Sequence, residues 1–129
     1  MSAACHCRDC QKLTGGAYSL TLMIPSAGFA VTAGEPLIGG LHRAELQHRF
    51  CPHCHNWLFT SGSALPGFVN LRPAMLADSS WVKPFIETKT AERLPGAVTG
   101  AAISFEGWPP PESFGALLEG FARQGARPV

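Results

Sequence analysis

The stretch that decides the fold is CHCRDCQKLTGG, residues 5–16, which carries three cysteines close to the first residue. Cys5, Cys7 and Cys10 follow the spacing C-x-C-x-x-C. Thiols this close along a chain can occupy three corners of one tetrahedral metal site. Zn²⁺ suits such a set best, because it prefers thiolate ligands and imposes no redox chemistry. The opening stretch therefore predicts a zinc site.

A second motif, CPHC, supplies the other two cysteines, Cys51 and Cys54. A C-x-x-C turn at the end of a strand places two sulfur atoms on one side of a tight knuckle, as in small zinc modules. Buried free thiols, disulfides and a redox-active pair are the alternatives. No thioredoxin-like βαβ pattern surrounds this motif, so metal binding is the favoured interpretation for all five cysteines.

Five thiols can be divided between metal ions in two ways. One division closes a four-cysteine site and leaves one cysteine spare, whereas the other makes a three-cysteine site with an open position and an incomplete pair. Joining Cys10 to Cys51 closes a loop of about 40 residues, which chain entropy permits. Spacing alone leaves both divisions open.

The histidines are weaker ligand candidates than the cysteines. A residue inside a closely spaced cysteine turn usually points outward, so we expect His53 and His6 to be solvated. His55 directly follows the knuckle. His48 shares the parity of Phe50 on a predicted strand, which indicates a core histidine with a hydrogen-bond partner.

Composition limits the classes of protein to which the chain can belong. Its 129 residues suit one domain, and 46% hydrophobic residues can form a core. Fourteen glycines and eleven prolines predict many turns and little helix. The net charge of +1, without a basic stripe, argues against nucleic-acid binding. No apolar run approaches about 18 residues, so no membrane span is expected. The polar first residues are not a signal peptide, so we expect a cytoplasmic location with reduced thiols.

Hydrophobic patterning predicts a mainly β chain that ends in one helix. Residues 94–111, rich in Gly, Pro and Ala, have no period and should wrap over the surface, and residues 73–81 read as a loop. Four apolar residues then recur at helical spacing behind Ser113, a plausible N-cap; they are Phe114, Leu117, Leu118 and Phe121. Alternation predicts strands over residues 17–24, 29–31, 44–50, 56–60, 68–72 and 85–89.

Two segments together carry a family resemblance. CHCRDCQKLTGGAYS, followed by RFCPHCHNWLF, resembles the glutathione-dependent formaldehyde-activating enzyme family, which also includes centromere protein V. The resemblance runs from Cys5 to about Pro110 and includes the TAGEP turn, Trp81 and the FEGWP segment. It implies an antiparallel β-tent-like zinc-binding domain. We therefore expect one such domain over residues 1–129, with a core at about 5–110 and the helix at about 113–124.

The resemblance also implies two zinc sites. Cys5, Cys7 and Cys10 match a three-thiolate site with an open position. Cys51 and Cys54 match half of a structural four-thiolate site, whose other half in the family is a C-x-C-G stretch further upstream.

The sequence departs from the family pattern at two places. It begins after the position of the C-x-C-G stretch, so the start codon is assigned too late, the copy is degenerate, or another chain or a histidine completes the site. His55 replaces a family glycine, and because histidine tolerates a left-handed turn less well, we expect an altered knuckle.

The function implied by the resemblance is carbon–sulfur chemistry. A thiol such as glutathione, bound at the open zinc position, would form or release an S-hydroxymethyl adduct with formaldehyde. This is the activity of a carbon–sulfur lyase, for which no catalytic residue beyond the ligands is identified. The alternatives are a non-enzymatic zinc module that binds a partner and a degenerate truncated copy.

Several residues near the motifs are candidates for holding the thiol. Arg8, Lys12 or Arg49 can attract the carboxylates of glutathione, although each also fits an ordinary solvated charge. The backbone of residues 14–16 can line the pocket or simply end a helix.

Overall fold

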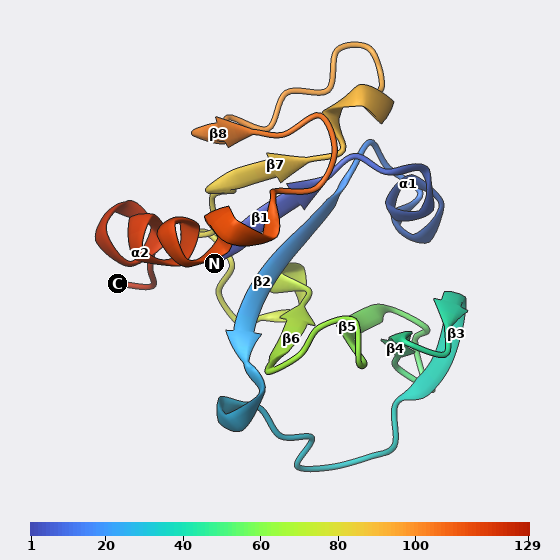
Figure 1. The fold of residues 1–129 in the computed structure, drawn as a ribbon. Coiled ribbons are helices and arrows are strands. Elements are labelled where there is room, and N and C mark those ends of the chain that lie inside the picture. Colours follow the sequence, from blue (N-terminus) through green and yellow to red (C-terminus); the bar gives the residue numbers. More distant parts are fainter.

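The chain folds as one eight-stranded sheet with two helices in a computed structural model that describes residues 1–41 and 43–129 (Figure 1). The strand order is β3-β4-β5-β6-β2-β1-β7-β8. The strands are β1 (Ser2–Cys5), β2 (Ser19–Pro25), β3 (Leu37–Arg43), β4 (Leu46–Phe50), β5 (Trp57–Ser61), β6 (Phe68–Leu71), β7 (Ile86–Thr88) and β8 (Ile103–Ser104). The helices are α1 (Arg8–Thr14) and α2 (Phe114–Gln124), with 3-10 turns at η1 (Ser26–Gly28), η2 (Pro73–Met75), η3 (Thr90–Glu92) and η4 (Pro111–Ser113).

The predicted fold class is confirmed: the chain is mainly β and ends in one helix. Consecutive neighbours from β3 to β1 pair in antiparallel fashion, whereas β7 runs parallel to both β1 and β8. The predicted strands at 17–24, 44–50, 56–60, 68–72 and 85–89 correspond to β2, β4, β5, β6 and β7.

One predicted strand is wrong, and β3 was not anticipated. Residues 29–31 form no strand; Phe29 instead packs its ring on Phe59 with 4.8 Å between centroids. The two glycines of β3 made this strand hard to predict, because glycine usually marks a turn. A Cβ at Gly39 would lie 3.3 Å from the Phe50 ring, and one at Gly40 would overlap the side chain of Leu13. The glycines thus permit close packing on an edge strand.

Three other elements carried too little pattern for prediction. β1 consists of small residues without alternation, yet Ala4 is completely buried between two neighbouring strands. β8 has two residues within the segment expected to wrap over the surface. Helix α1 begins after Cys7, whose sulfur accepts the N–H of Cys10 at 3.3 Å, and ends at Gly15 with φ of 63°.

The main hydrophobic cluster joins α2 to β1 and β7. Met1, Phe85, Ile86 and Leu117 are buried together, and the rings of Phe85 and Phe121 meet edge to face at 5.6 Å. In Figure 1, α2 lies beside the N-terminal end of β1. This packing confirms the apolar helix stripe that the sequence predicted.

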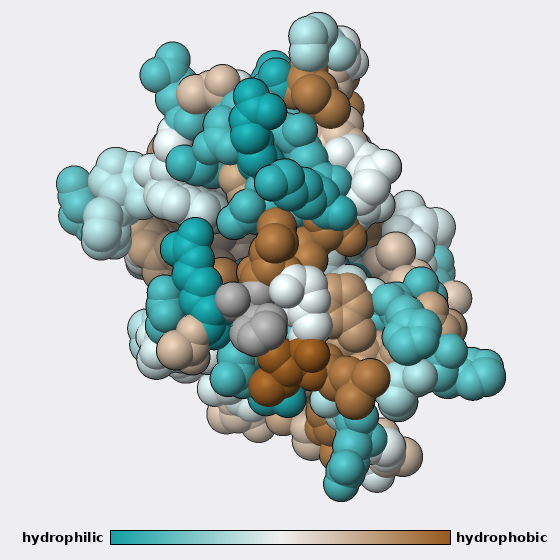
Figure 2. All heavy atoms as spheres, turned by 90° about the vertical axis from the view of Figure 1, so that its right-hand side faces the viewer, coloured by the Kyte–Doolittle hydropathy of each residue, from teal (hydrophilic) through white to brown (hydrophobic). Residues whose placement is uncertain are grey.

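The opposite side of the molecule, around α1 and β3, leaves apolar side chains in solvent (Figure 2). Leu37, Ile38 and Leu41 of β3 are each more than 40% exposed. Strand β3 occupies one end of the sheet, where only β4 pairs with it. The main cluster of buried apolar side chains lies towards the other end of the sheet, beside α2.

A buried carboxylate connects the elements around β7. Glu87 is 6% exposed and accepts hydrogen bonds from several side chains. The donors are Ser104 Oγ (2.6 Å), Arg93 Nη2 (2.6 Å), Thr99 Oγ1 (2.7 Å) and His6 Nε2 (2.9 Å). Because an ionised carboxylate only accepts, His6 carries a proton on Nε2. One charge thereby joins β7, β8 and the residue that follows β1.

The expectation that His6 is solvated is wrong, because its side chain is completely buried. Its backbone N–H donates to Thr88 O at 3.0 Å, so pairing with β7 continues past the end of β1. Because this pairing holds the backbone of His6 in the sheet, its side chain cannot turn into solvent as it could in a loop.

We expect Glu87→Ala to lower the free energy of unfolding by about 3 kcal/mol, because it removes the acceptor shared by a buried cluster of donors. Urea unfolding of the variant measures the loss. Glu106→Ala, at an exposed site, is the matched control and should change stability by less than about 0.5 kcal/mol. Equal effects of the two substitutions would contradict this role for Glu87.

The same carboxylate predicts an acid-dependent loss of stability. Burial raises the pKa of Glu87, but its hydrogen bonds and the charge of Arg93 outweigh burial and lower the pKa from 4.5 to about 2. A lowered folded-state pKa stabilises the protein above the unfolded-state value, and this contribution disappears as pH falls from 4.5 towards about 2. The stability difference between the wild type and Glu87→Gln should therefore shrink over that range in acid-dependent urea melts.

Candidate metal centre

Three cysteines meet where β1 passes into α1. The sulfur atoms of Cys5, Cys7 and Cys10 all lie within 4.8 Å of one another. Cys5 is the last residue of β1, Cys7 caps α1, and Cys10 lies in the first turn of the helix. A strand, a two-residue turn and a helix thus direct three thiols to one point. This group can hold a metal ion.

Neighbouring side chains fix the positions of the cluster and of α1. The hydroxyl of Ser19 on β2 donates to the sulfur of Cys10 at 3.1 Å. The amide of Gln11 donates to the carbonyl oxygens of His6 (2.8 Å) and Glu92 (3.0 Å). The N–H of Arg8 donates to the Glu92 carboxylate at 2.8 Å. The sheet therefore holds Cys10 through Ser19, and the segment after β7 holds the start of α1 through Glu92.

The electrostatics of the cluster favour a bound cation. Hydrogen bonds with Cys10 and Cys7 lower the pKa of Cys5, whereas hydrogen bonds with Cys5 and Cys7, together with burial, raise the pKa of Cys10. Without a cation, the cluster therefore stabilises one thiolate and keeps a proton on its neighbour. A metal ion would replace that proton, because its charge offsets the repulsion between thiolates. The three sulfur ligands fit a thiolate-binding metal.

The CPHC motif forms a separate knuckle. The N–H of His55 donates to Cys51 O and the N–H of Cys51 to Asn56 O, both at 2.9 Å. Backbone N–H groups of Cys54 and His53, together with the Cys54 thiol, lower the pKa of Cys51. Among the described residues, no third ligand joins this pair in a metal-type group. The five thiols are thus divided into three and two.

His55 occupies the left-handed region in this knuckle, with φ of 59°. The turn keeps the backbone form that a glycine favours, although the side chain makes that form more costly. The backbone hydrogen bonds around Cys51 compensate for part of this cost.

Among the histidines that the structure describes, none joins the cysteine cluster. His53 is exposed, as predicted. His48 is 6% exposed, and its Nδ1 lies 2.8 Å from Thr60 Oγ1, which confirms the core histidine with a hydrogen-bond partner.

Of the three cations predicted to attract a thiol's carboxylates, two are exposed and the third lines an apolar pocket. Arg8 and Lys12 are exposed on α1.

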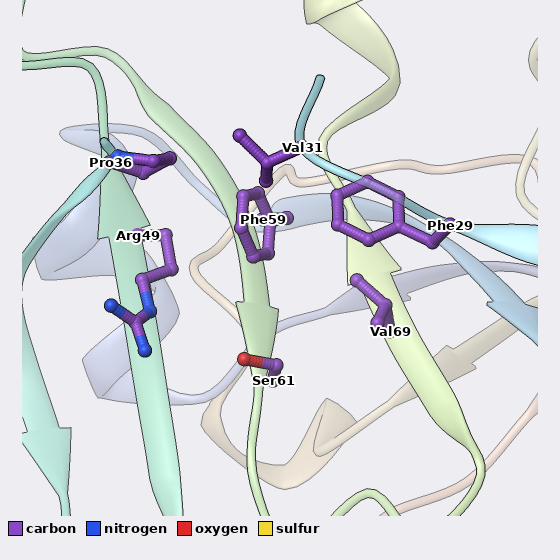
Figure 3. A pocket seen from close by; sticks show the side chains of 7 residues that line it. All are labelled: Phe29, Val31, Pro36, Arg49, Phe59, Ser61 and Val69. Carbon is purple, nitrogen blue, oxygen red and sulfur yellow. The ribbon is translucent and has the colours of Figure 1, made fainter. Parts of the chain in front are cut away.

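Arg49 shares its sheet face with Phe59, its pairing partner on β5, and alternation places His48 and Thr60 on the other face. Arg49 and Phe59 help to line an apolar pocket of about 270 Å³ (Figure 3). The other lining residues are Phe29, Val31, Pro36, Ser61 and Val69.

Sequence reasoning missed Arg72, which directly follows β6. Arg72 is 7% exposed, and its guanidinium lies 3.8 Å from the centre of the Trp57 ring. Burial lowers its pKa to about 10, although the charges of Cys10 and Cys5 act in the opposite direction. One signal in the sequence could have found it: Asn70 and Arg72 are two residues apart in a predicted strand that is otherwise apolar, so both polar side chains lie on one face.

Comparisons with known proteins agree with the geometry. The family model for the glutathione-dependent formaldehyde-activating enzyme matches residues 1–92, a range that includes all five cysteines. A comparison with curated proteins finds no match. Among the described residues, no helix has the length and apolar character needed to cross a membrane. With its three-cysteine cluster, its knuckle and most of its length covered by this match, the chain belongs to the glutathione-dependent formaldehyde-activating enzyme family.

Proposed function

We propose that the chain binds zinc through Cys5, Cys7 and Cys10 and binds a thiol beside that ion. The observation that carries the proposal is the number of ligands, because a structural zinc site is closed by four protein groups and this cluster offers three. When bound, zinc supplies an open position at which an incoming thiol loses its proton. The family match supports glutathione as that thiol.

The reaction that fits this site joins a thiol to formaldehyde and is reversible. The sulfur forms a bond to the carbonyl carbon, and the proton lost by the thiol ends on the carbonyl oxygen. The product is an S-hydroxymethyl thioether, and the reverse reaction is a carbon–sulfur lyase step. The reaction requires neither an oxidant nor a reductant.

The residues of the chain hold the cluster in place during this chemistry. β1 fixes Cys5, the capping interaction orients Cys7, and the Ser19 hydroxyl contacts Cys10. Ligands on regular elements keep their geometry better than ligands on loops. Thiolate ligands also require a reducing environment, so the proposal includes a cytoplasmic location.

The purified protein should contain one tightly held zinc ion per chain. Cys10→Ser should lose it, because two thiolates form a poor site, whereas Cys54→Ser should retain it as the matched control. Native mass spectrometry and metal analysis measure both. Equal zinc retention in the two variants would contradict the assignment of the cluster.

Glutathione should enter the metal site. In the cobalt-substituted protein we expect the sulfur-to-metal absorption to grow when glutathione is added, because a fourth thiolate joins the ion. Addition of formaldehyde to the zinc form should accelerate formation of S-hydroxymethylglutathione, followed by NMR. If the ion is held tightly while glutathione neither binds nor alters the spectrum, the site is structural, and a zinc module that binds a partner becomes the better interpretation.

A further inference from the structure

Arg72 is a buried cation that stacks on Trp57 but forms no ion pair with the described residues. The residue is 7% exposed, and its Nε and Nη1 atoms are buried without a hydrogen-bond partner. Within the described part of the chain, no carboxylate forms an ion pair with it. A buried charge is costly unless an opposite charge and hydrogen bonds compensate for the lost hydration. Arg72 is therefore poised to receive an acceptor from outside the chain.

The guanidinium is held in position by a chain of contacts from the sheet. Arg72 stacks on the ring of Trp57 at 3.8 Å. The indole N–H of Trp57 donates to Thr60 Oγ1 at 3.1 Å, and the ring of His48 meets the Trp57 ring edge to face at 5.1 Å. An irregularity between β4 and β5 pairs Trp57 with Phe50, which puts it on the face of Thr60. The cation is thus preorganised.

Strand register places Arg72 on the face of the sheet that carries the cysteine cluster. Asn70 pairs with Met23 of β2, and Arg72 follows two residues later with an extended backbone, so the two side chains share a face. Ser19 lies four residues before Met23 and pairs with Cys5. Arg72, Asn70, Ser19 and Cys5 therefore lie on one side of the sheet.

The same face of the sheet carries a second unsatisfied group. Asn70 Oδ1 is buried without a hydrogen-bond partner. It accepts an N–H, whereas Arg72 donates to an acceptor. Burial lowers the pKa of Arg72, and the charges of Cys10 and Cys5 act in the opposite direction. A ligand that meets both residues would carry an anionic oxygen and an amide.

Resting on the proposed thiol binding, we propose that Arg72 binds a carboxylate of the incoming thiol and thereby selects carboxylate-bearing thiols over neutral ones. A carboxylate matches the planar donors of a guanidinium and supplies the hydrogen-bond acceptors that Arg72 Nε and Nη1 lack. A peptide-like thiol, with an amide N–H for Asn70, satisfies both side chains. Arg72 is then a specificity-determining residue, and the cluster itself binds the sulfur.

The test compares two thiols that differ in charge. The zinc-loaded wild type, Arg72→Met and Arg72→Lys are titrated by calorimetry with 3-mercaptopropionate and with 2-mercaptoethanol. We expect Arg72→Met to weaken binding of the carboxylate-bearing thiol about tenfold or more and to leave the neutral thiol unchanged. Arg72→Lys should give an intermediate loss, because it keeps the charge and loses the planar donors.

Controls separate recognition from folding and from a general charge effect. Arg72→Met replaces an unpaired buried cation by an apolar side chain of similar length, so its melting temperature should be equal or higher. Arg123→Met, on the exposed face of α2, should change neither affinity. An equal loss for both thiols would mean that Arg72 only balances thiolate charge, which overturns the proposal. A larger loss in Arg49→Met than in Arg72→Met also overturns it.

A final measurement distinguishes failure of this inference from failure of the proposed function. If neither thiol binds to the zinc-loaded wild type, the thiol-binding function fails. Propionate is then added, and the Nε–H resonance of Arg72, assigned by its loss in Arg72→Met, is followed by NMR. A shift of that resonance supports a carboxylate site at Arg72, and an unchanged resonance overturns it.

Discussion

The hydrogen-bonded position of β1 between β2 and β7 is the constraint on which the cysteine site depends. Pairing on both sides fixes Cys5 opposite Ser19 and Thr88, and it continues far enough to bury His6. The buried carboxylate of Glu87 then holds the His6 ring. The chain leaves the sheet only after this anchor, so α1 begins at a defined place and brings its two thiols back to the strand.

The sheet face that carries the cysteine cluster also carries a cation, Arg72, which suits an anionic ligand. In the proposed function, three thiolates around a divalent ion would leave one net negative charge, and an incoming thiolate would add another. Arg72 is a buried cation on that face, and burial beside Trp57 keeps water from screening it. The exposed cations of α1 are screened by solvent and contribute little.

Patterning foresaw the strands that alternate clearly and missed those that do not. β2 and β4 have one apolar and one polar face, and the C-terminal helix has an apolar stripe, so each was visible in the sequence. β1 is made of small residues, and β3 contains Gly39 and Gly40. Their stability comes from neighbours that lie far away in sequence, and local patterns carry no record of those neighbours.

The sequence by itself determined the family and a group of thiols that can hold a metal ion, because cysteine spacing within a short turn limits which sulfur atoms can share an ion. Spacing alone could not divide the five thiols, since loop closure permits both arrangements. The family resemblance implied a division into three and two, and the tertiary structure separates Cys51 and Cys54 from the cluster. The tertiary structure also decided the positions of His6 and Arg72, because burial and partners depend on strand register and on an irregularity between β4 and β5, neither of which is written in local sequence.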